Sequence, residues 1–221
     1  FDSISARRIK KIETQTNHDV KAVEIFISEK LKKLNKSKLK PWVHFGLTSE
    51  DINNISYSMM WKDGIKNVYL DKLNAVIKAI KSLTSKHSKD AILSLTHGQP
   101  ATPTTFGKEM AVFYNRLNKH YKKLKKLELE GKISGATGTW AAHVCAYPEI
   151  DWLKFSKRLV KSFGLKHNPL TTQIESHDSL AEQYHLLSRV NSVLIDFSND
   201  IWFYISRGIL IQKKVGGETG S

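Results

Sequence analysis

The chain has 221 residues, enough for one large domain or two small ones, and its 40% hydrophobic content together with a single cysteine, Cys145, excludes a disordered chain and an internal disulfide framework. The formal net charge is +14 at pH 7, but the lysines are scattered or lie on the outward side of a predicted helix at residues 122–126. A solvated basic surface is therefore favoured over a nucleic-acid partner. The most apolar run, residues 201–211, is too short for a membrane span and carries Arg207, and no secretory signal is present, so we expect no membrane partner and a cytoplasmic location.

Helical periodicity dominates the N-terminal part of the chain. Residues 3–15 place three isoleucines on one side of a predicted helix. Residues 16–19 predict the start of a second helix, with Asp19 at its third position in a capping-box role. That helix continues with apolar residues at helical spacing over residues 23–34, and the polar residues 35–38 end it.

A third predicted helix begins after Thr48. Thr48 followed by Asp51 is a capping signature. Gly64 either kinks this helix or is tolerated within it, and the helical pattern then continues to about His87.

Residues 95–103 predict a constrained loop between two long helices. One glycine, two prolines and two threonines surround His97, a composition that a regular helix would not tolerate. Thr102 is predicted as the N-cap and Pro103 as the first residue of an amphipathic helix that extends through Leu124. Such a loop would hold the imidazole still. The alternative is that His97 is a loop residue that only caps a neighbouring helix.

The segments that follow alternate between loops and short helices. Residues 131–139 predict a glycine-rich turn that allows close backbone approach but lacks the P-loop pattern. Glu149 and Asp151 lie in the first turn of another predicted helix, where acidic residues suit the helix dipole. Residues 168–178 form a polar loop with Ser176 as the expected cap of the last helix.

The last predicted helix covers residues 179–213, and its apolar residues nearly encircle it. At about 1.5 Å per residue it would span roughly 50 Å. A chain of this size cannot cover such a rod alone, so we expect other subunits to do so. The closing residues 215–221 are glycine-rich and expected to be flexible. The whole pattern predicts an all-α fold.

Three polar segments, residues 17–19, 48–50 and 96–98, lie at or just before predicted helix N-termini. Helix N-termini present free N–H groups and favour phosphates and carboxylates, so an anion site is one interpretation and ordinary capping is the other. No metal is expected, because no two histidines share helical spacing and the cysteine has no partner. No nucleophile-elbow pattern is present either.

Seven short segments, spread over the chain, carry a resemblance to known enzymes. These are residues 8–10, 17–24, 44–51, 96–103, 132–136, 168–175 and 217–221. In this order they resemble the fumarase/aspartase superfamily and, within it, the adenylosuccinate lyase family. The resemblance implies a long-helix bundle of the fumarase/aspartase type, without a cofactor, assembled as a homotetramer with active sites shared between subunits. It implies that residues 1–40 end an N-terminal helical domain and that residues 41–221 belong to the central bundle domain, cut at the signature loop.

The resemblance also implies a reaction and a set of residues. The reaction is the acid–base β-elimination of fumarate from adenylosuccinate, giving AMP, and from SAICAR, giving AICAR, in purine biosynthesis. His97 matches the general acid, His18 a second active-site histidine, and Ser221, or the residue after it, the base. His44 matches a position beside the pocket. The residues that match contacts to the nucleotide substrate are Asn17, Asp19, Thr48, Ser49, Thr96 and Gln173.

The chain also departs from the family pattern. It begins without a methionine and lacks the lysine and asparagine of the signature loop, the N-terminal substrate motif and the last helical domain. We therefore expect a piece of a longer protein that is inactive alone. The alternatives are argininosuccinate lyase, a structural bundle without catalysis, and a basic nucleic-acid module. Intact His18, His97 and Gln173 disfavour the structural bundle.

Overall fold

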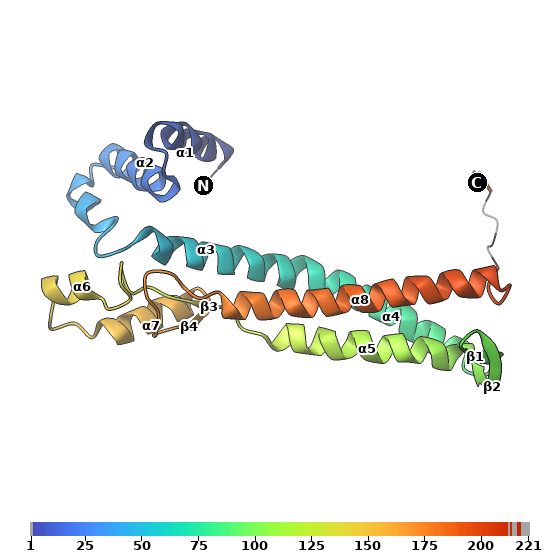
Figure 1. Ribbon diagram of the computed structural model, residues 1–221. Coiled ribbons are helices and arrows are strands. Elements are labelled where there is room, and N and C mark those ends of the chain that lie inside the picture. Colours follow the sequence, from blue (N-terminus) through green and yellow to red (C-terminus); the bar gives the residue numbers. More distant parts are fainter. Residues whose placement is uncertain (1, 212, 214–215, 218–221) are drawn as a thin grey trace. The chain divides into compact units, whose positions relative to one another are not determined.

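The computed structural model describes residues 2–211, 213 and 216–217 and is mainly helical (Figure 1). Two compact units are present, Phe1–Asp63 with Glu128–Leu180, and Gly64–Leu127 with Ala181–Ser221. The all-α prediction is confirmed, since strands in the described part form only two short pairs. The predicted domains, 1–40 and 41–221, stay a prediction.

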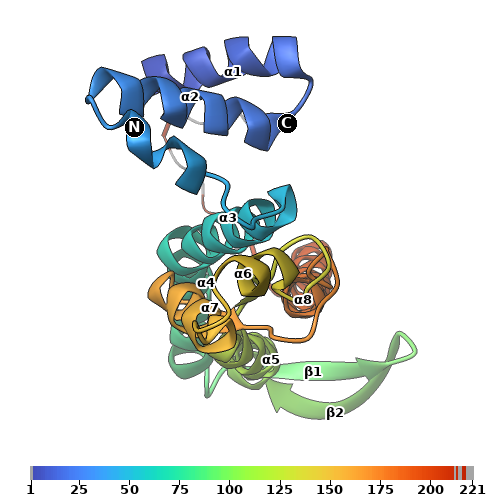
Figure 2. The same cartoon turned by 90° about the vertical axis from the view of Figure 1, so that its left-hand side faces the viewer.

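The first unit packs short and medium helices around two small cores. Its elements are α1 (Ser3–Thr16), α2 (Asp19–Lys33), the 3-10 helix η1 (Ser37–Trp42), α3 (Ser49–Gly64), β3 (Glu130–Gly131), α6 (Ala141–Ala146), α7 (Trp152–Ser162) and β4 (Lys166–His167). Figure 2 shows α1 and α2 side by side, and Ile12, Ala22 and Phe26 are buried between them. The second core contains Ile55, Val160 and Leu165. The pairing of β3 with β4 is parallel and joins chain segments about 36 residues apart in the sequence.

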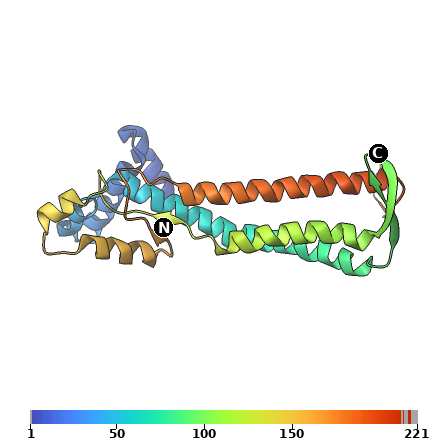
Figure 3. The same cartoon turned by 60° about the horizontal axis from the view of Figure 1, so that its bottom comes forward.

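The second unit is a three-helix bundle that carries a β-hairpin. Its elements are the π-helical turn η2 (Ile65–Tyr69), α4 (Leu70–Lys86), β1 (Ala91–Thr96), β2 (Gln99–Thr105), α5 (Phe106–Lys126) and the greater part of α8 (Asp178–Ser206). In Figure 3, α4, α5 and α8 run side by side. The buried core between them includes Leu73, Ile77, Met110, Leu117 and Val190. This spacing of three and four residues is what the sequence periodicity predicts.

The junction of α1 and α2 corrects the predicted cap. Asn17 ends α1 in the left-handed conformation, with φ 50°. His18 is the N-cap of α2, and its Nδ1 accepts a hydrogen bond from the Lys21 amide at 3.4 Å. Asp19 is therefore the first helical residue of α2 and not the third, because the imidazole takes the capping place expected of Thr16.

The predicted loop at residues 95–103 is wrong, because this stretch belongs to an antiparallel hairpin. His97 and Gly98 form its turn, with φ values of 50° and 74°. In the described part of the chain, β1 and β2 form a two-stranded sheet, so one side of each strand makes no ladder hydrogen bonds. A proline on that side loses nothing, and β2 therefore accommodates Pro100 and Pro103.

The start of α5 shifts accordingly. Thr105 is the N-cap, and its Oγ1 accepts a hydrogen bond from the Lys108 amide at 3.1 Å. The prediction of Thr102 as cap and Pro103 as first helical residue is wrong, because both residues lie in β2.

Three further boundaries differ from the predictions. Helix α7 begins only after Asp151, whose Oδ1 caps it by accepting from the Lys154 amide at 2.8 Å, and α6 was not predicted at all. Helix α8 begins at Asp178, after His177 and not after the expected cap Ser176. It ends at Ser206, seven residues before the predicted end, because Gly208 takes up the left-handed conformation that commonly stops a helix.

Gly64 does not end the helix, because a π-helical turn follows it and α4 continues the helical path.

Among the described residues, no helix combines the length and apolar character needed to cross a bilayer. Of the expected flexible residues 215–221, only 216 and 217 are among the described residues.

Candidate functional site

The N-terminus of α3 and the N-terminus of α2 meet through their polar side chains. His18 Nε2 and Ser49 Oγ are hydrogen bonded at 3.3 Å. Asn53 Nδ2, one turn further along α3, donates to Asp19 Oδ2 at 3.5 Å. Both N-terminal ends have free N–H groups, which attract anions. Three residues predicted for the site, His18, Asp19 and Ser49, are thus brought together.

A third segment reaches the same end of α3. Thr48 is buried, and its amide donates to Asp51 Oδ2 at 2.9 Å, which confirms the predicted capping interaction. Gln173 Nε2 donates to Thr48 Oγ1 at 3.1 Å. Residues 125 positions apart in the sequence are therefore neighbours, and the exposed residue Gln173 is hydrogen bonded to another predicted substrate contact, Thr48.

An ion pair lies beneath this polar surface. The side chains of Asp51 and Lys132 are both fully buried, with 2.9 Å between Oδ1 and Nζ. Asp51 also accepts from the amides of Ser134 and Gly135, at 3.0 and 3.1 Å. Lys132 Nζ donates to the Gly135 carbonyl at 3.0 Å. A buried pair with its remaining hydrogen-bonding positions filled holds its surroundings in one arrangement.

Sequence reasoning missed this pair. Asp51 was predicted only as a helix-capping residue, and Lys132 only as part of a family motif. The available signal was a lysine isolated in a run of small and apolar residues, but spacing along the chain cannot show which carboxylate would reach it.

His143 is a second residue that the sequence did not single out. It is buried between aromatic rings, with ring centroids 5.6 Å from Phe45 and 4.8 Å from Trp152. Burial lowers the pKa of His143, although the nearby Asp51 carboxylate acts in the opposite direction. The ring fills the space beside Gly46, where an added Cβ would lie 2.5 Å from Nε2. His143 therefore supports the loop before Thr48 as a neutral, packed side chain.

A pocket of about 720 Å³ beside the α1–α2 junction is lined by Asn17, His18 and Asp19. The remaining predicted residues lie elsewhere. His44 Nε2 is 3.2 Å from Glu24 Oε1. Thr96 and His97 belong to the second unit, where they are exposed at the hairpin turn. Ser221 lies outside the described residues.

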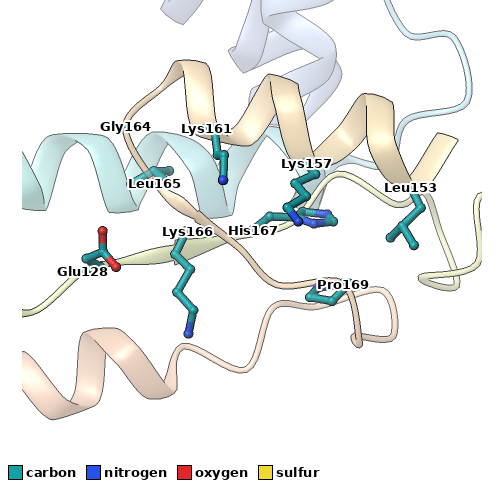
Figure 4. A pocket seen from close by; sticks show the side chains of 9 residues that line it. All are labelled: Glu128, Leu153, Lys157, Lys161, Gly164, Leu165, Lys166, His167 and Pro169. Atoms are coloured by element: carbon teal, nitrogen blue, oxygen red, sulfur yellow. The ribbon is translucent and has the colours of Figure 1, made fainter. Parts of the chain in front are cut away.

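A cavity of about 760 Å³ lies between α7 and β4 and contains none of the predicted site residues. Figure 4 shows Lys157 and Lys161 pointing from α7 toward the strand that carries Lys166 and His167. Burial, and secondarily Lys157, lower the pKa of His167. Lys166 Nζ is paired with Glu130 Oε1 at 2.7 Å, and Glu128 also lines the cavity. These carboxylates partly neutralise the positive charge of the lysines that line the cavity. Within the described ranges, no group of three or more His, Cys, Asp or Glu residues could hold a metal ion.

Comparison with known proteins agrees with the family resemblance that the sequence motifs indicate. A family described as lyase matches residues 1–221. The chain is 47% identical to an adenylosuccinate lyase of Buchnera aphidicola subsp. Acyrthosiphon pisum (strain APS) and 46% identical to that of Escherichia coli (strain K12). Each alignment covers 100% of this chain and 49% of the relative, so the chain spans about half the length of the curated relatives it matches.

Solved structures show the same fold. A fumarate lyase from Mesorhizobium sp. BNC1 superimposes with a TM-score of 0.74 at 22% identity, over 90% of this chain and 45% of that one. The 3-carboxy-cis,cis-muconate lactonizing enzyme from Pseudomonas putida gives a TM-score of 0.69 at 21% identity, over 90% and 44% of the two chains. At these identities the likeness concerns the fold alone.

Proposed function

The chain belongs to the lyase family, and on that premise we propose that the complete protein cleaves adenylosuccinate to AMP and fumarate, and SAICAR to AICAR and fumarate. Relatives at 44–47% identity, from several bacteria, are adenylosuccinate lyases by name. The names of these relatives favour this substrate over argininosuccinate. We place the reaction in purine biosynthesis and the protein in the cytoplasm.

The observation that carries the proposal is the meeting of three distant polar segments in the first unit. His18 contacts Ser49 at 3.3 Å, and Gln173 contacts Thr48 at 3.1 Å. Hydroxyl, amide and imidazole groups beside two helix N-termini are suited to bind the carboxylates and phosphate of such a substrate. Asn17, Asp19 and Thr96 are the further substrate contacts that we propose.

The chemistry requires a base and an acid. The base removes the proton from the carbon beside a succinyl carboxylate, a C=C bond forms, and the electrons of the C–N bond pass to the leaving nitrogen. The acid then protonates that nitrogen. We assign the base to Ser221 or the residue after it, the acid to His97, and a supporting proton-transfer or binding role to His18. An imidazole ring suits these roles, because it can both donate and accept a proton at one of its two nitrogens.

The proposed assembly is a homotetramer in which subunits share active sites, with no cofactor, membrane or nucleic-acid partner. Its support is the apolar surface of α8, where Ile195 is 61% and Trp202 64% exposed. Aromatic and aliphatic side chains of this size are usually covered by a partner when they lie together on one helix.

Fumarate release from adenylosuccinate by the full-length protein is the direct test. Replacing Gln173 with Glu should raise KM for adenylosuccinate by about ten- to hundredfold, because a carboxylate there would repel the anionic substrate and lose a donor. The matched control is Gln15→Glu, an exposed position in α1. Release of fumarate from argininosuccinate instead, or equal KM values for the two variants, would contradict the proposal.

A further inference from the structure

The segment at residues 168–177, which carries Gln173, has neither regular secondary structure nor an apolar anchor at its exposed middle. Leu170 is 90% exposed and Ile174 is 59% exposed, so these side chains contribute little packing. A segment of this kind needs polar contacts to hold a single conformation. One such contact joins Thr171 Oγ1 to Ser134 Oγ at 3.3 Å.

Glu175 supplies the strongest of these contacts from inside the segment. Its side chain is only 2% exposed. Oε1 accepts from Asn168 Nδ2 at 2.8 Å, and Oε2 accepts from the His177 amide at 2.6 Å. Both ends of the segment are therefore tied to one buried carboxylate, which closes the segment into a loop.

His177 connects this loop to α3. Its backbone has φ 60°, a left-handed conformation that is uncommon among residues other than glycine. Its Nδ1 lies 3.3 Å from Glu175 Oε2, and its Nε2 lies 3.5 Å from Glu50 Oε1. Glu50 directly follows Ser49 in the first turn of α3. A continuous chain of polar groups thus runs from Asn168 to the end of α3 where Gln173 binds Thr48.

We propose that Glu175 and His177 are positioning residues that hold Gln173 against Thr48 for substrate binding. Neither side chain is assigned a contact with the substrate. This inference rests on the proposed function for the role of Gln173, but the contacts that position the loop are independent of it.

The first test is a variant that removes one acceptor and keeps the shape. Glu175 uses its two oxygens to accept from two donors, whereas a glutamine would offer one acceptor and turn its NH₂ group toward the other donor. In the full-length protein, Glu175→Gln should raise KM for adenylosuccinate about ten- to hundredfold and change kcat less, because a hydrogen bond to a charged group is lost outside the reacting atoms. Glu182→Gln, at an exposed position in α8, is the matched control and should leave both constants unchanged.

A second variant separates positioning from a general loss of stability. In Asn168→Asp/Glu175→Gln, the Gln Nε2 can donate to the new aspartate, and the Gln Oε1 can still accept from the His177 amide. This exchange of donor and acceptor should return KM close to the wild-type value. Wild-type KM in the single variant, or no recovery in the double variant, would overturn the proposal.

Amide hydrogen exchange gives a readout that does not depend on the reaction. Exchange at the His177 amide should be faster in Glu175→Gln, return toward the wild-type rate in the double variant, and stay unchanged within α5. If the wild-type protein releases no fumarate from adenylosuccinate, the proposed function is wrong, and the exchange rates still decide whether Glu175 holds the loop. Unchanged exchange at His177 would refute that role.

Discussion

At the residue scale, the buried pair of Asp51 and Lys132 supports the polar surface formed by Thr48, Ser49 and Gln173. One carboxylate accepts from the ammonium group and from three backbone amides, so the end of α3 and the 132–135 turn are fixed to each other. The pair need not make a net contribution to stability over an apolar replacement, because removing both charges from water is costly. Its consequence is positional: neither segment can move without leaving a charge unpaired.

Removing one partner of this pair should therefore be costly. Asp51→Asn is expected to lower the free energy of unfolding by about 3–5 kcal/mol, since it leaves the Lys132 ammonium buried without its counterion. Urea denaturation followed by circular dichroism measures the loss. Arg8→Gln is the control, because Arg8 and Glu29 form an exposed ion pair and such pairs contribute little to stability. Similar losses in the two variants would show that the buried pair has no special role.

His97 can be tested without adding backbone strain. It adopts a left-handed conformation in the hairpin turn, and asparagine tolerates that conformation better than alanine does. Since Thr105 caps α5, His97 has no capping duty there, and His97→Asn should leave the thermal midpoint nearly unchanged. If it is the general acid, turnover of adenylosuccinate by the full-length protein should fall roughly 10²- to 10⁴-fold.

Fumarate release and thermal melting of the same sample check the prediction for His97. His185→Asn, at an exposed position on α8, serves as the control for loss of an imidazole. A destabilised but active His97→Asn protein would refute the acid assignment and favour a structural role for this side chain.

At the element scale, two loops approach each other more closely than any side chain would permit. Gly138 lies in the 131–139 turn with φ 77°, and a Cβ added there would be 2.0 Å from the Thr171 carbonyl oxygen. Both loops belong to the first unit, and the second of them carries Gln173. Contact through a glycine lets one backbone pack directly on the other.

Gly138→Ala should consequently destabilise the first unit by more than backbone strain alone. Gly208 provides the matched control, because it has a similar φ of 70° and nothing within 4 Å of an added Cβ. Gly208→Ala should lose about 1–2 kcal/mol, the usual strain of a left-handed alanine, whereas Gly138→Ala must also push the two loops apart. Thermal unfolding of both variants gives the comparison, and equal shifts would show that the close approach is unimportant.

The same elements show what can be predicted from sequence and what cannot. Apolar residues recur every three or four positions in α5, and this local periodicity correctly predicted a long amphipathic helix there. The hairpin was missed because pairing of Ile92 with Thr104 is a non-local interaction, while Pro103 after Thr102 is locally typical of a helix start. Motifs located Thr48 and Gln173, but only the folded chain shows that the two side chains are hydrogen bonded. Glu175 lies in the 168–175 motif, but the sequence did not indicate its positioning role, since its partners depend on how the loop closes.

At the scale of the whole molecule, α8 has more apolar surface than its own chain covers. Val190 and Val193 are buried in the bundle, while Ile195, Trp202 and Phe203 remain exposed. The sequence predicted that other subunits cover α8, and these three exposed side chains are the ones that such subunits would bury. The tetramer itself stays a prediction.

Light scattering of the full-length protein at micromolar concentration should give the mass of four chains. Ile195→Lys should shift the mass toward smaller species, because burying an ammonium group in an apolar interface is costly. Ile4→Lys, at a similarly exposed isoleucine of α1, should leave the tetramer intact. A monomeric wild-type protein, or equal dissociation by both variants, would contradict the assignment of α8 to the interface.

The prolines of the hairpin have a consequence for the whole protein during synthesis and at high concentration. Each strand of a two-stranded sheet has an edge with unpaired backbone groups. Such an edge could pair with an extended segment of another chain and begin aggregation. An irregularity in register places two residues of β2, Ala101 and Thr102, opposite one residue of β1, Ser94, so Pro100 and Pro103 face the same way. The unpaired edge of β2 therefore lacks two amide N–H donors and is a poor template for pairing with a further strand. The hairpin can project its turn into solvent and remain two-stranded.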